Sequence, residues 1–147
     1  MMQTLEFKNY ELAPVGNFLG ELKLKARASR GRSKLLKLIS DKNKEYNEEL
    51  DDVRKTYFES DENGDLKVEN GNYVLKKGGD TSKLNAELQE LMNEKSVIDC
   101  TEYLEKFNAL CQELLDYPYE LDNQTALIYD LLMDKLEKLE KEESDVK

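Results

Sequence analysis

The most informative absence in this 147-residue sequence is that of histidine. Without histidine the chain cannot build the Ser-His-Asp or Cys-His arrangements that activate nucleophiles. It also lacks the commonest metal ligand, which is the side chain that normally titrates near neutral pH. The two cysteines, Cys100 and Cys111, cannot complete a structural zinc site by themselves. An enzyme built on this sequence would therefore depend on carboxylates, with or without a hard cation, or on lysine.

Long apolar runs are missing as well. No run approaches the ~18–20 residues that a membrane span needs. The first residues, Met1-Met2-Gln3-Thr4-Leu5-Glu6, have neither the basic nor the apolar region of a signal peptide. The two cysteines form no Cys-x-x-Cys motif, so we expect free thiols in a reducing compartment. These absences predict a cytoplasmic protein without membrane association.

Charge, by contrast, is abundant and unbalanced. Charged residues make up 37% of the chain, and 32 acidic against 22 basic residues give a net charge of −10. A typical globular protein has roughly 25% charged residues. The length fits one domain, so we predict a single domain over residues 1–147, with a hairpin insertion at about 60–80 and a frayed acidic tail at about 142–147.

Hydrophobic periodicity predicts an α+β fold that is predominantly α-helical, with about five helices. Residues 4–8 alternate as a short strand would, and a helix opens at Asn9 with Pro14 in its first turn. A long helix is expected from about residue 24 to 58, either broken near residues 29–31 or protruding. Its apolar stripe over residues 35–57 could form an intramolecular core or join two copies in a helical dimer.

The second half of the chain predicts a β-hairpin followed by three helices. Asn70-Gly71 supplies the two positive φ angles of a type I′ turn between two short strands. Residues 96–99 are expected to pair with residues 4–8 as a two-stranded ribbon. The helix caps predicted from residue type are Thr81 or Ser82, then Thr101, then Asp122 or Asn123.

Basic residues are concentrated in one segment. Residues 22–39 contain seven basic residues and no acidic one, so the rest of the chain carries −17. On one continuous helix, five of them would share a face: Lys23, Arg27, Arg30, Lys34 and Lys37. Arg32 lies in the same segment. Such a face could pair with the chain's own carboxylates or remain solvated, bind an acidic protein surface, or bind nucleic acid.

Two tyrosines form a second candidate contact site. Tyr117 and Tyr119 flank Pro118 in a connection that we expect to be exposed. Tyrosine is favoured in binding hot spots because it adds contact area at low entropic cost. The alternative is that these rings close over the ends of helices.

The acidic residues suggest metal chemistry only weakly. Asp61-x-Asn63-x-Asp65 lacks the glycine and glutamate that complete a calcium loop, which favours a plain turn. Carboxylates at helical spacing could hold Mg²⁺, as in all-α nucleotide pyrophosphatases, or could form a solvated face. They are Glu45, Glu48, Glu49 and Asp52 in one predicted helix, and Glu87, Glu90 and Glu94 in another.

Several segments together resemble a known family. They are residues 7–14 (FKNYELAP), residues 22–36 with their LKLK and RGRSKLL motifs, the hairpin, residues 97–99 (VID) and residues 117–121 (YPYEL). The chain resembles the domain-of-unknown-function family numbered 1617, uncharacterised proteins of phages and prophages of Gram-positive bacteria. The resemblance covers nearly the whole chain. It implies a phage origin, with a place in the host cytoplasm or the virion, and implies no active site.

We therefore expect a non-enzymatic, phage-derived protein that binds another protein, as a modulator of a host factor or as a virion or assembly component. The partner-binding residues would be Lys23, Arg27, Arg30, Arg32, Lys34, Lys37, Tyr117 and Tyr119. No cofactor and no metal is expected. The alternatives are a nucleic-acid-binding accessory protein and a Mg²⁺-dependent carboxylate enzyme.

Overall fold

The structure is a computed structural model of the chain, and it describes residues 3–146, without the side chains of residues 140–146. Five α-helices and four short strands are found in this range, which confirms the predominantly helical α+β fold. The chain forms two compact units. Unit 1 holds the residues up to Asn43 and from Lys95 onward, and unit 2 holds Lys44–Glu94. The two units are described separately below.

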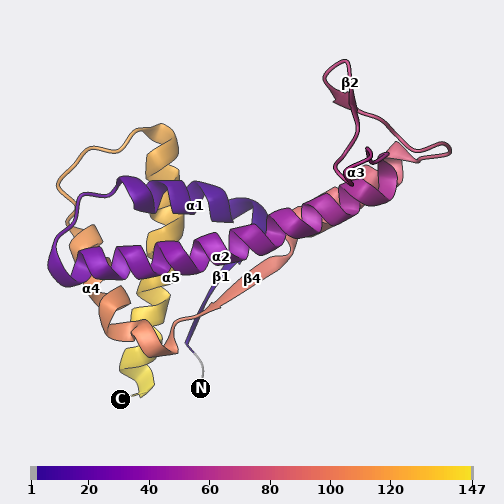
Figure 1. Ribbon diagram of the computed structural model, residues 1–147. Coiled ribbons are helices and arrows are strands. Elements are labelled where there is room, and N and C mark those ends of the chain that lie inside the picture. The colour runs from indigo at the N-terminus through magenta and orange to yellow at the C-terminus, as the bar shows by residue number, and fades with distance from the viewer. Residues whose placement is uncertain (1–2, 147) are drawn as a thin grey trace. The chain divides into compact units, whose positions relative to one another are not determined.

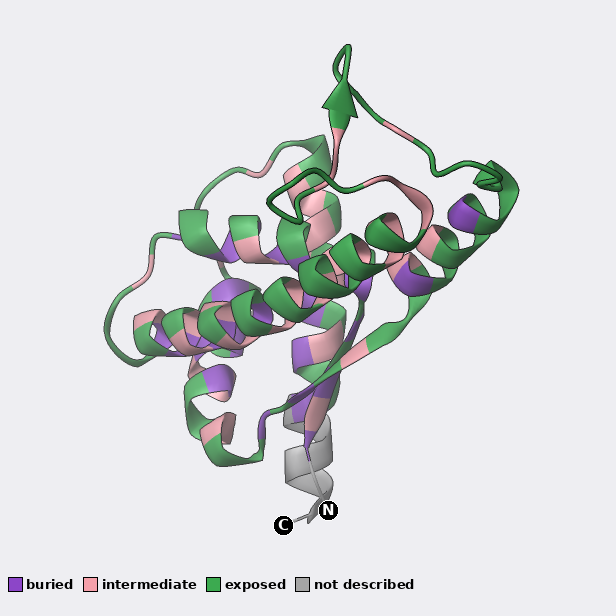
Figure 2. Ribbon diagram, turned by 45° about the vertical axis from the view of Figure 1, so that its right-hand side comes forward, coloured by how far each residue is buried: buried purple, intermediate pink, exposed green. Residues whose placement is uncertain are grey.

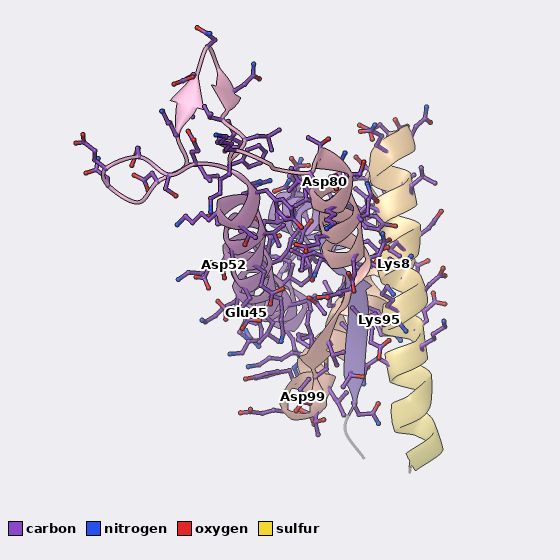
Figure 3. The ribbon with its side chains drawn as sticks, turned by 90° about the vertical axis from the view of Figure 1, so that its right-hand side faces the viewer. Lys8, Glu45, Asp52, Asp80, Lys95 and Asp99 are labelled. Atoms are coloured by element: carbon purple, nitrogen blue, oxygen red, sulfur yellow. The ribbon has the colours of Figure 1, made fainter. Side chains whose placement is uncertain are left out.

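Unit 1 contains the expected two-stranded ribbon. Strand β1 (Thr4–Lys8) pairs antiparallel with β4 (Lys95–Asp99), with Lys8 opposite Lys95 and Thr4 opposite Asp99. Figure 3 labels Lys8 and Lys95 at one end of the ribbon and Asp99 at the other. The alternating residues Leu5 and Phe7 turn inward and are almost completely buried, as period-2 patterning requires. The predicted pairing of residues 4–8 with 96–99 is thus confirmed.

Three helices close the core of unit 1. Helix α5 (Asn123–Val146) contacts β1, α1 (Asn9–Glu21) and α4 (Leu104–Leu115), and a short 3₁₀-helix, η1 (Thr101–Tyr103), precedes α4. The buried apolar residues of these helices recur every three or four positions and face one another. In α1 they are Leu12, Val15, Phe18 and Leu19, in α4 Phe107, Leu110, Cys111 and Leu114, and in α5 Leu132, Met133, Leu136 and Leu139.

Helix α2 (Ala26–Tyr57) runs without a break for 32 residues, which excludes the first of the two alternatives, a break near residues 29–31. Gly31 costs a helix interior about 1 kcal/mol, but here it allows a close approach to α4. A Cβ atom on Gly31 would lie 2.3 Å from the carbonyl oxygen of Lys106. Packing therefore explains the glycine that sequence reasoning took for a helix breaker. Figure 1 shows α2 as one long helix that belongs partly to unit 1 and, from Lys44 on, to unit 2.

Unit 2 consists of the end of α2, a β-hairpin and α3 (Thr81–Asn93). Strands β2 (Val68–Glu69) and β3 (Asn72–Tyr73) pair antiparallel around Asn70 and Gly71, whose φ angles of 53° and 81° fit the predicted type I′ turn. The hairpin strands are exposed, as the green ribbon in Figure 2 shows. Asp61 accepts hydrogen bonds from the backbone N–H groups of Asn63 and Asp65, which confirms a plain turn.

Two of the predicted helix caps differ from those observed. Asp80, not Thr81 or Ser82, caps α3 by accepting from the backbone N–H groups of Ser82 and Lys83. Thr101 does not cap α4, because it lies within η1 and the N-cap position of α4 is Tyr103. The Thr101 hydroxyl instead accepts a hydrogen bond from the backbone N–H of Gln3. Pro14 lies inside α1, beyond the first turn where we expected it.

The predicted cap of the last helix is confirmed, since the Asp122 carboxylate accepts from the Thr125 N–H. Helix α5 continues to Val146, Lys147 lies outside the described residues, and the fraying of residues 142–147 stays a prediction.

Candidate functional site

Three of the predicted contact residues meet on the surface of unit 1. Lys23 lies in the short connection between α1 and α2, and the two tyrosines lie between α4 and α5. The backbone N–H of Lys23 donates a hydrogen bond of 3.1 Å to the Tyr117 hydroxyl, across 94 residues of sequence. The Lys23 Nζ lies 4.8 Å from the centre of the Tyr119 ring, a cation–π distance. The rings of Tyr117 and Tyr119 are 5.3 Å apart.

A groove of about 410 Å³ lies beside these residues. Its apolar lining comes from Phe18, Leu22 and Leu121 together with the two tyrosine rings. Its charged lining is mixed, because Lys23 is accompanied by Glu21, Glu120 and Asp122. The groove therefore offers an aromatic surface with charges of both signs.

The Asp122 carboxylate at this groove is also a structural group. It accepts from Thr125, and these hydrogen bonds from the Thr125 side chain and backbone lower its pKa below the usual aspartate value. Asp122 therefore stays ionised at neutral pH, at the N-terminus of α5, where a negative charge is favourable.

Four basic side chains of α2 share one helix face. At ~100° per residue, Arg27, Arg30, Lys34 and Lys37 fall within about 80° of one another around the helix axis. Lys34 lies 4.6 Å from the centre of the Tyr103 ring, and Lys37 pairs with Asp41 at 3.7 Å on the exposed surface. Arg27 and Arg30 are exposed and have no hydrogen bond, ion pair or ring contact in the described part of the chain.

Lys23 does not continue this helix face, contrary to the single five-residue stripe predicted above. The chain leaves α1 at Glu21, and α2 begins only at Ala26, whose φ angle is 52°. A positive φ at a non-glycine residue turns the backbone sharply. This turn breaks the helical phase between Lys23 and Arg27 and directs Lys23 to the tyrosines.

The side chain of Arg32 has a structural role and is not available to a binding partner. Its Nη1 atom donates to the carbonyl oxygens of Leu22 at 2.7 Å and Leu19 at 3.2 Å, and its Nη2 donates to the Ser29 hydroxyl. The carbonyls at the end of α1 lack helical partners. The guanidinium of Arg32 satisfies them and so joins α1 to α2, which removes Arg32 from the set of residues available to a partner.

Five of the seven carboxylates considered for Mg²⁺ line one groove within unit 2, and Glu45 and Glu48 do not. Glu49 and Asp52 of α2, Glu87 and Glu90 of α3, and Glu94 at the C-cap of α3 line this groove of about 390 Å³, together with Val53 and Leu91. Glu45 and Asp52 both lie on α2 in Figure 3. Nevertheless, no three acidic or thiol groups among the described residues stand close enough together to hold a metal ion.

Glu87 also has a partner within unit 2. It accepts a hydrogen bond from the Tyr57 hydroxyl at 3.0 Å. The pKa of Tyr57 is raised by desolvation, and further by the hydrogen bond and negative charge of Glu87.

Both cysteines are free and buried, which confirms their predicted state. Burial raises the pKa of the Cys100 thiol to about 12, so the reactive thiolate is scarce at neutral pH. Cys111 is packed in the apolar face of α4, as its spacing predicted. Neither thiol is placed as a nucleophile.

Sequence reasoning missed three features of the surface around the basic segment and the Tyr117 groove. The side chain of Lys25 is exposed and has no partner among the described residues, although its backbone carbonyl accepts from the Ser29 N–H, and its spacing did not fit the predicted stripe. Tyr103 meets Lys34 through tertiary packing alone. The acidic residues around the Tyr117 groove, Glu21 and Glu120, come from different elements, and no local pattern connects them.

The fold and these residues define a small α+β protein with exposed cations that follow one another into the start of α2, the first of which contacts two tyrosines. We call the set Lys23, Lys25, Arg27, Arg30, Tyr117 and Tyr119 the basic-aromatic surface. The chain belongs to the family described as "Protein of unknown function (DUF1617)", whose family model matches residues 2–143. No match was found among curated proteins or among solved structures. Across residues 3–146, no helix combines the length and apolar character of a membrane span.

Proposed function

We propose that this protein is a non-enzymatic binding protein that recognises an acidic surface of another protein through its basic-aromatic surface. The observation that carries the proposal is the unpaired state of Arg27 and Arg30. The chain has ten more acidic than basic residues. These two guanidinium groups nevertheless contact no carboxylate within the described part of the chain. They are therefore free to pair with the carboxylates of a partner.

The residue types of the basic-aromatic surface suit recognition of a protein. Arginine and tyrosine are enriched in the energetic centres of protein interfaces, and Tyr119 is 48% exposed beside Lys23. The Tyr117 hydroxyl is held by the Lys23 backbone, so its ring is positioned before a partner arrives. A preorganised contact loses less entropy on binding than a mobile one.

Nucleic acid is the second candidate, and the charges around the groove weigh against it. Glu21, Glu120 and Asp122 line the groove next to Lys23, and these carboxylates would repel a phosphate backbone. The overall charge of −10 would also oppose approach to a polyanion. A protein surface that carries both signs of charge fits this environment better.

The family resemblance supports placing the partner in a bacterial host cell or in a virion. We propose that the protein acts there as a modulator of a host factor or as an assembly component. Its role would be to occupy an acidic surface and not to transform a substrate.

The test is an affinity pull-down from host lysate, performed with and without nuclease. A partner bound through the basic-aromatic surface should survive nuclease and should be lost from the double variant Arg27→Glu/Arg30→Glu. Reversing two charges in a complementary interface should weaken binding about tenfold or more. Calorimetry then measures the affinity of the purified partner for the wild type and for the double variant.

The matched control is Lys76→Glu/Lys77→Glu, which makes the same change of net charge at two exposed lysines of unit 2. The control should retain wild-type affinity. Equal loss from both variants would mean that net charge alone drives capture, and the proposed site would be wrong. Loss of all bound material on nuclease treatment, with a steep decrease of affinity with salt, would assign the surface to nucleic acid.

A further inference from the structure

We propose that the outward face of α1 is a self-association surface, on which two copies of this chain pack with their α1 helices antiparallel about a two-fold axis. This surface adjoins the basic-aromatic surface at Glu21, which lines a groove on each of them. The proposal rests on three observations within unit 1: a helix face almost without charge, two grooves beside it, and opposite charges at its two ends.

The outward face of α1 is unusual for this chain because it is nearly uncharged. Six exposed residues share it: Tyr10, Ala13, Pro14, Asn17, Gly20 and Glu21. Only Glu21 is charged among them, although 37% of the whole chain is charged. The cores of protein interfaces are depleted of charged residues and enriched in tyrosine. A helix face that is simply exposed to solvent has no need to exclude charged residues.

Two shallow grooves lie along α1 and extend this charge-poor surface. The groove toward α5, about 590 Å³, is lined by Tyr10, Pro14, Leu127, Ile128 and Leu131, and Glu11 is its one charged lining residue. Leu127 is 69% exposed, the highest value among the large apolar side chains of the described residues. An exposed leucine in an apolar groove loses contact with water when a partner covers it, which stabilises the complex.

The groove toward α2, about 550 Å³, is lined by small and polar residues together with Leu36 and Ile39. Ala13, Gly16 and Gly20 form its α1 side, and a Cβ atom added at Gly20 would meet no atom within 4 Å. The second helix of a pair can therefore approach the α1 backbone closely. Glu21 is the one charged residue of this groove.

The charges at the ends of α1, where Glu11 is held by a hydrogen bond from the Lys8 N–H and the Lys8 ammonium is exposed, favour a second copy in antiparallel orientation. Lys8 is exposed immediately before α1, and Glu21 is its last residue. Glu21 lies where the helix dipole disfavours a negative charge, α1 has no basic residue in its last turn, and no partner of Glu21 is found within residues 3–139. An antiparallel second copy would place its own Lys8 near Glu21, and the same pairing would occur at the other end.

The overall charge also restricts where two copies can meet. Each copy carries −10, so most surfaces would bring acidic residues together. The α1 face reduces this repulsion, because its few charges occur at its ends, with Lys8 and Glu11 at one end and Glu21 at the other. A two-fold axis through the middle of α1 makes the face complementary to itself, as closed dimers require.

Sedimentation of the full chain from micromolar to submillimolar concentration tests the proposal. We expect a monomer–dimer equilibrium, and Leu127→Glu should raise its dissociation constant at least tenfold. Lys8→Glu and Glu21→Lys should each weaken the dimer, since each homodimer would then contain two like-charged pairs. An equimolar mixture of these two variants should form a heterodimer, because both of its pairs are again opposite in sign. Native mass spectrometry with one variant labelled with ¹⁵N identifies the heterodimer.

The control variants Lys77→Glu and Glu62→Lys make the same charge changes in exposed turns of unit 2 and should dimerise like the wild type. A wild-type chain that stays monomeric at submillimolar concentration would overturn the proposal. So would a dimer that Leu127→Glu and the charge variants leave unchanged, since another surface would then form it. If the equimolar mixture of Lys8→Glu and Glu21→Lys formed no heterodimer, the antiparallel arrangement would be excluded.

Discussion

Gly31 is a residue at which the backbone of α2 closely approaches α4. A Cβ atom there would lie 2.3 Å from the Lys106 carbonyl oxygen and 3.0 Å from its carbonyl carbon, which are backbone atoms that cannot rotate away. Gly31→Ala should therefore force the two helices apart and lower the free energy of unfolding by about 1–3 kcal/mol. Urea denaturation followed by circular dichroism measures the change.

Gly16→Ala is the matched control. Gly16 is also a helix residue, but its added Cβ would make ordinary contacts of 3.6 Å with Leu36 and Ile39. This variant should be stabilised by roughly 0.5–1 kcal/mol, because alanine loses less entropy in a helix than glycine does. Equal effects of the two substitutions would contradict the close approach at Gly31.

Cys100 is the residue whose titration should affect stability at high pH. Its pKa is raised from 9.0 to about 12 by burial, so above pH 9 the unfolded chain loses the thiol proton while the folded chain keeps it. The contribution of this group to stability is complete below pH 9 and is lost as the pH rises toward 12.

Urea titrations of the wild type and Cys100→Ala at several alkaline pH values measure this effect. The variant should lose less stability than the wild type between pH 9 and 11, apart from a constant offset for the smaller side chain. A native thiol that reacts with iodoacetamide at pH 8 as fast as the unfolded one would show that Cys100 is not shielded.

At the scale of elements, the start of α3 depends on one side chain. Asp80 accepts from two backbone N–H groups in the first turn, whereas Thr81, the residue that the cap preference favoured, lies inside the helix. Asp80→Ala should lower the free energy of unfolding of this part of the chain by about 1 kcal/mol, and Thr81→Ala should change it by only a few tenths. Chemical denaturation of both variants, followed by the helical signal, distinguishes them. A larger effect at Thr81 would assign the cap there.

The elements themselves could largely be predicted from local pattern. Periodicity located the ribbon strands, the long helix and the hairpin, because alternation and three-to-four spacing follow directly from backbone geometry. The Asn70-Gly71 turn was predicted from the positive φ angles that this dipeptide tolerates. A break near Gly31 was one of two alternatives for the long helix, and it does not occur, because the low helix propensity of glycine is outweighed by packing.

At the scale of the whole molecule, the buried apolar residues are unevenly divided. Only Leu84 and Leu91 of unit 2 are buried among the described residues, whereas unit 1 contains the ribbon, α1, α4 and α5 core. Segments with few buried apolar contacts open locally at a lower free energy. Backbone amides within residues 44–94 should therefore exchange with deuterium faster than those of α4 and the buried part of α5.

Hydrogen–deuterium exchange with mass spectrometry measures this by peptide. The amides of α1 and α4 serve as the internal reference, since their buried faces belong to the same core. Equal protection of both units would mean that the chain opens only as a whole. That result would also favour the single domain predicted from chain length.

The sequence by itself determined the elements and the concentration of positive charge in residues 22–39, because both depend on residues close together in the chain. Only the tertiary structure decided which of those cations remain available. Arg32 is occupied by the carbonyl oxygens of Leu19 and Leu22, whereas Arg27, a few residues earlier in the same segment, has no partner among the described residues. The meeting of Lys23 with Tyr117, across 94 residues, likewise followed from packing. Local spacing specifies the side of a helix on which a residue lies, but the partner it meets there depends on distant parts of the chain.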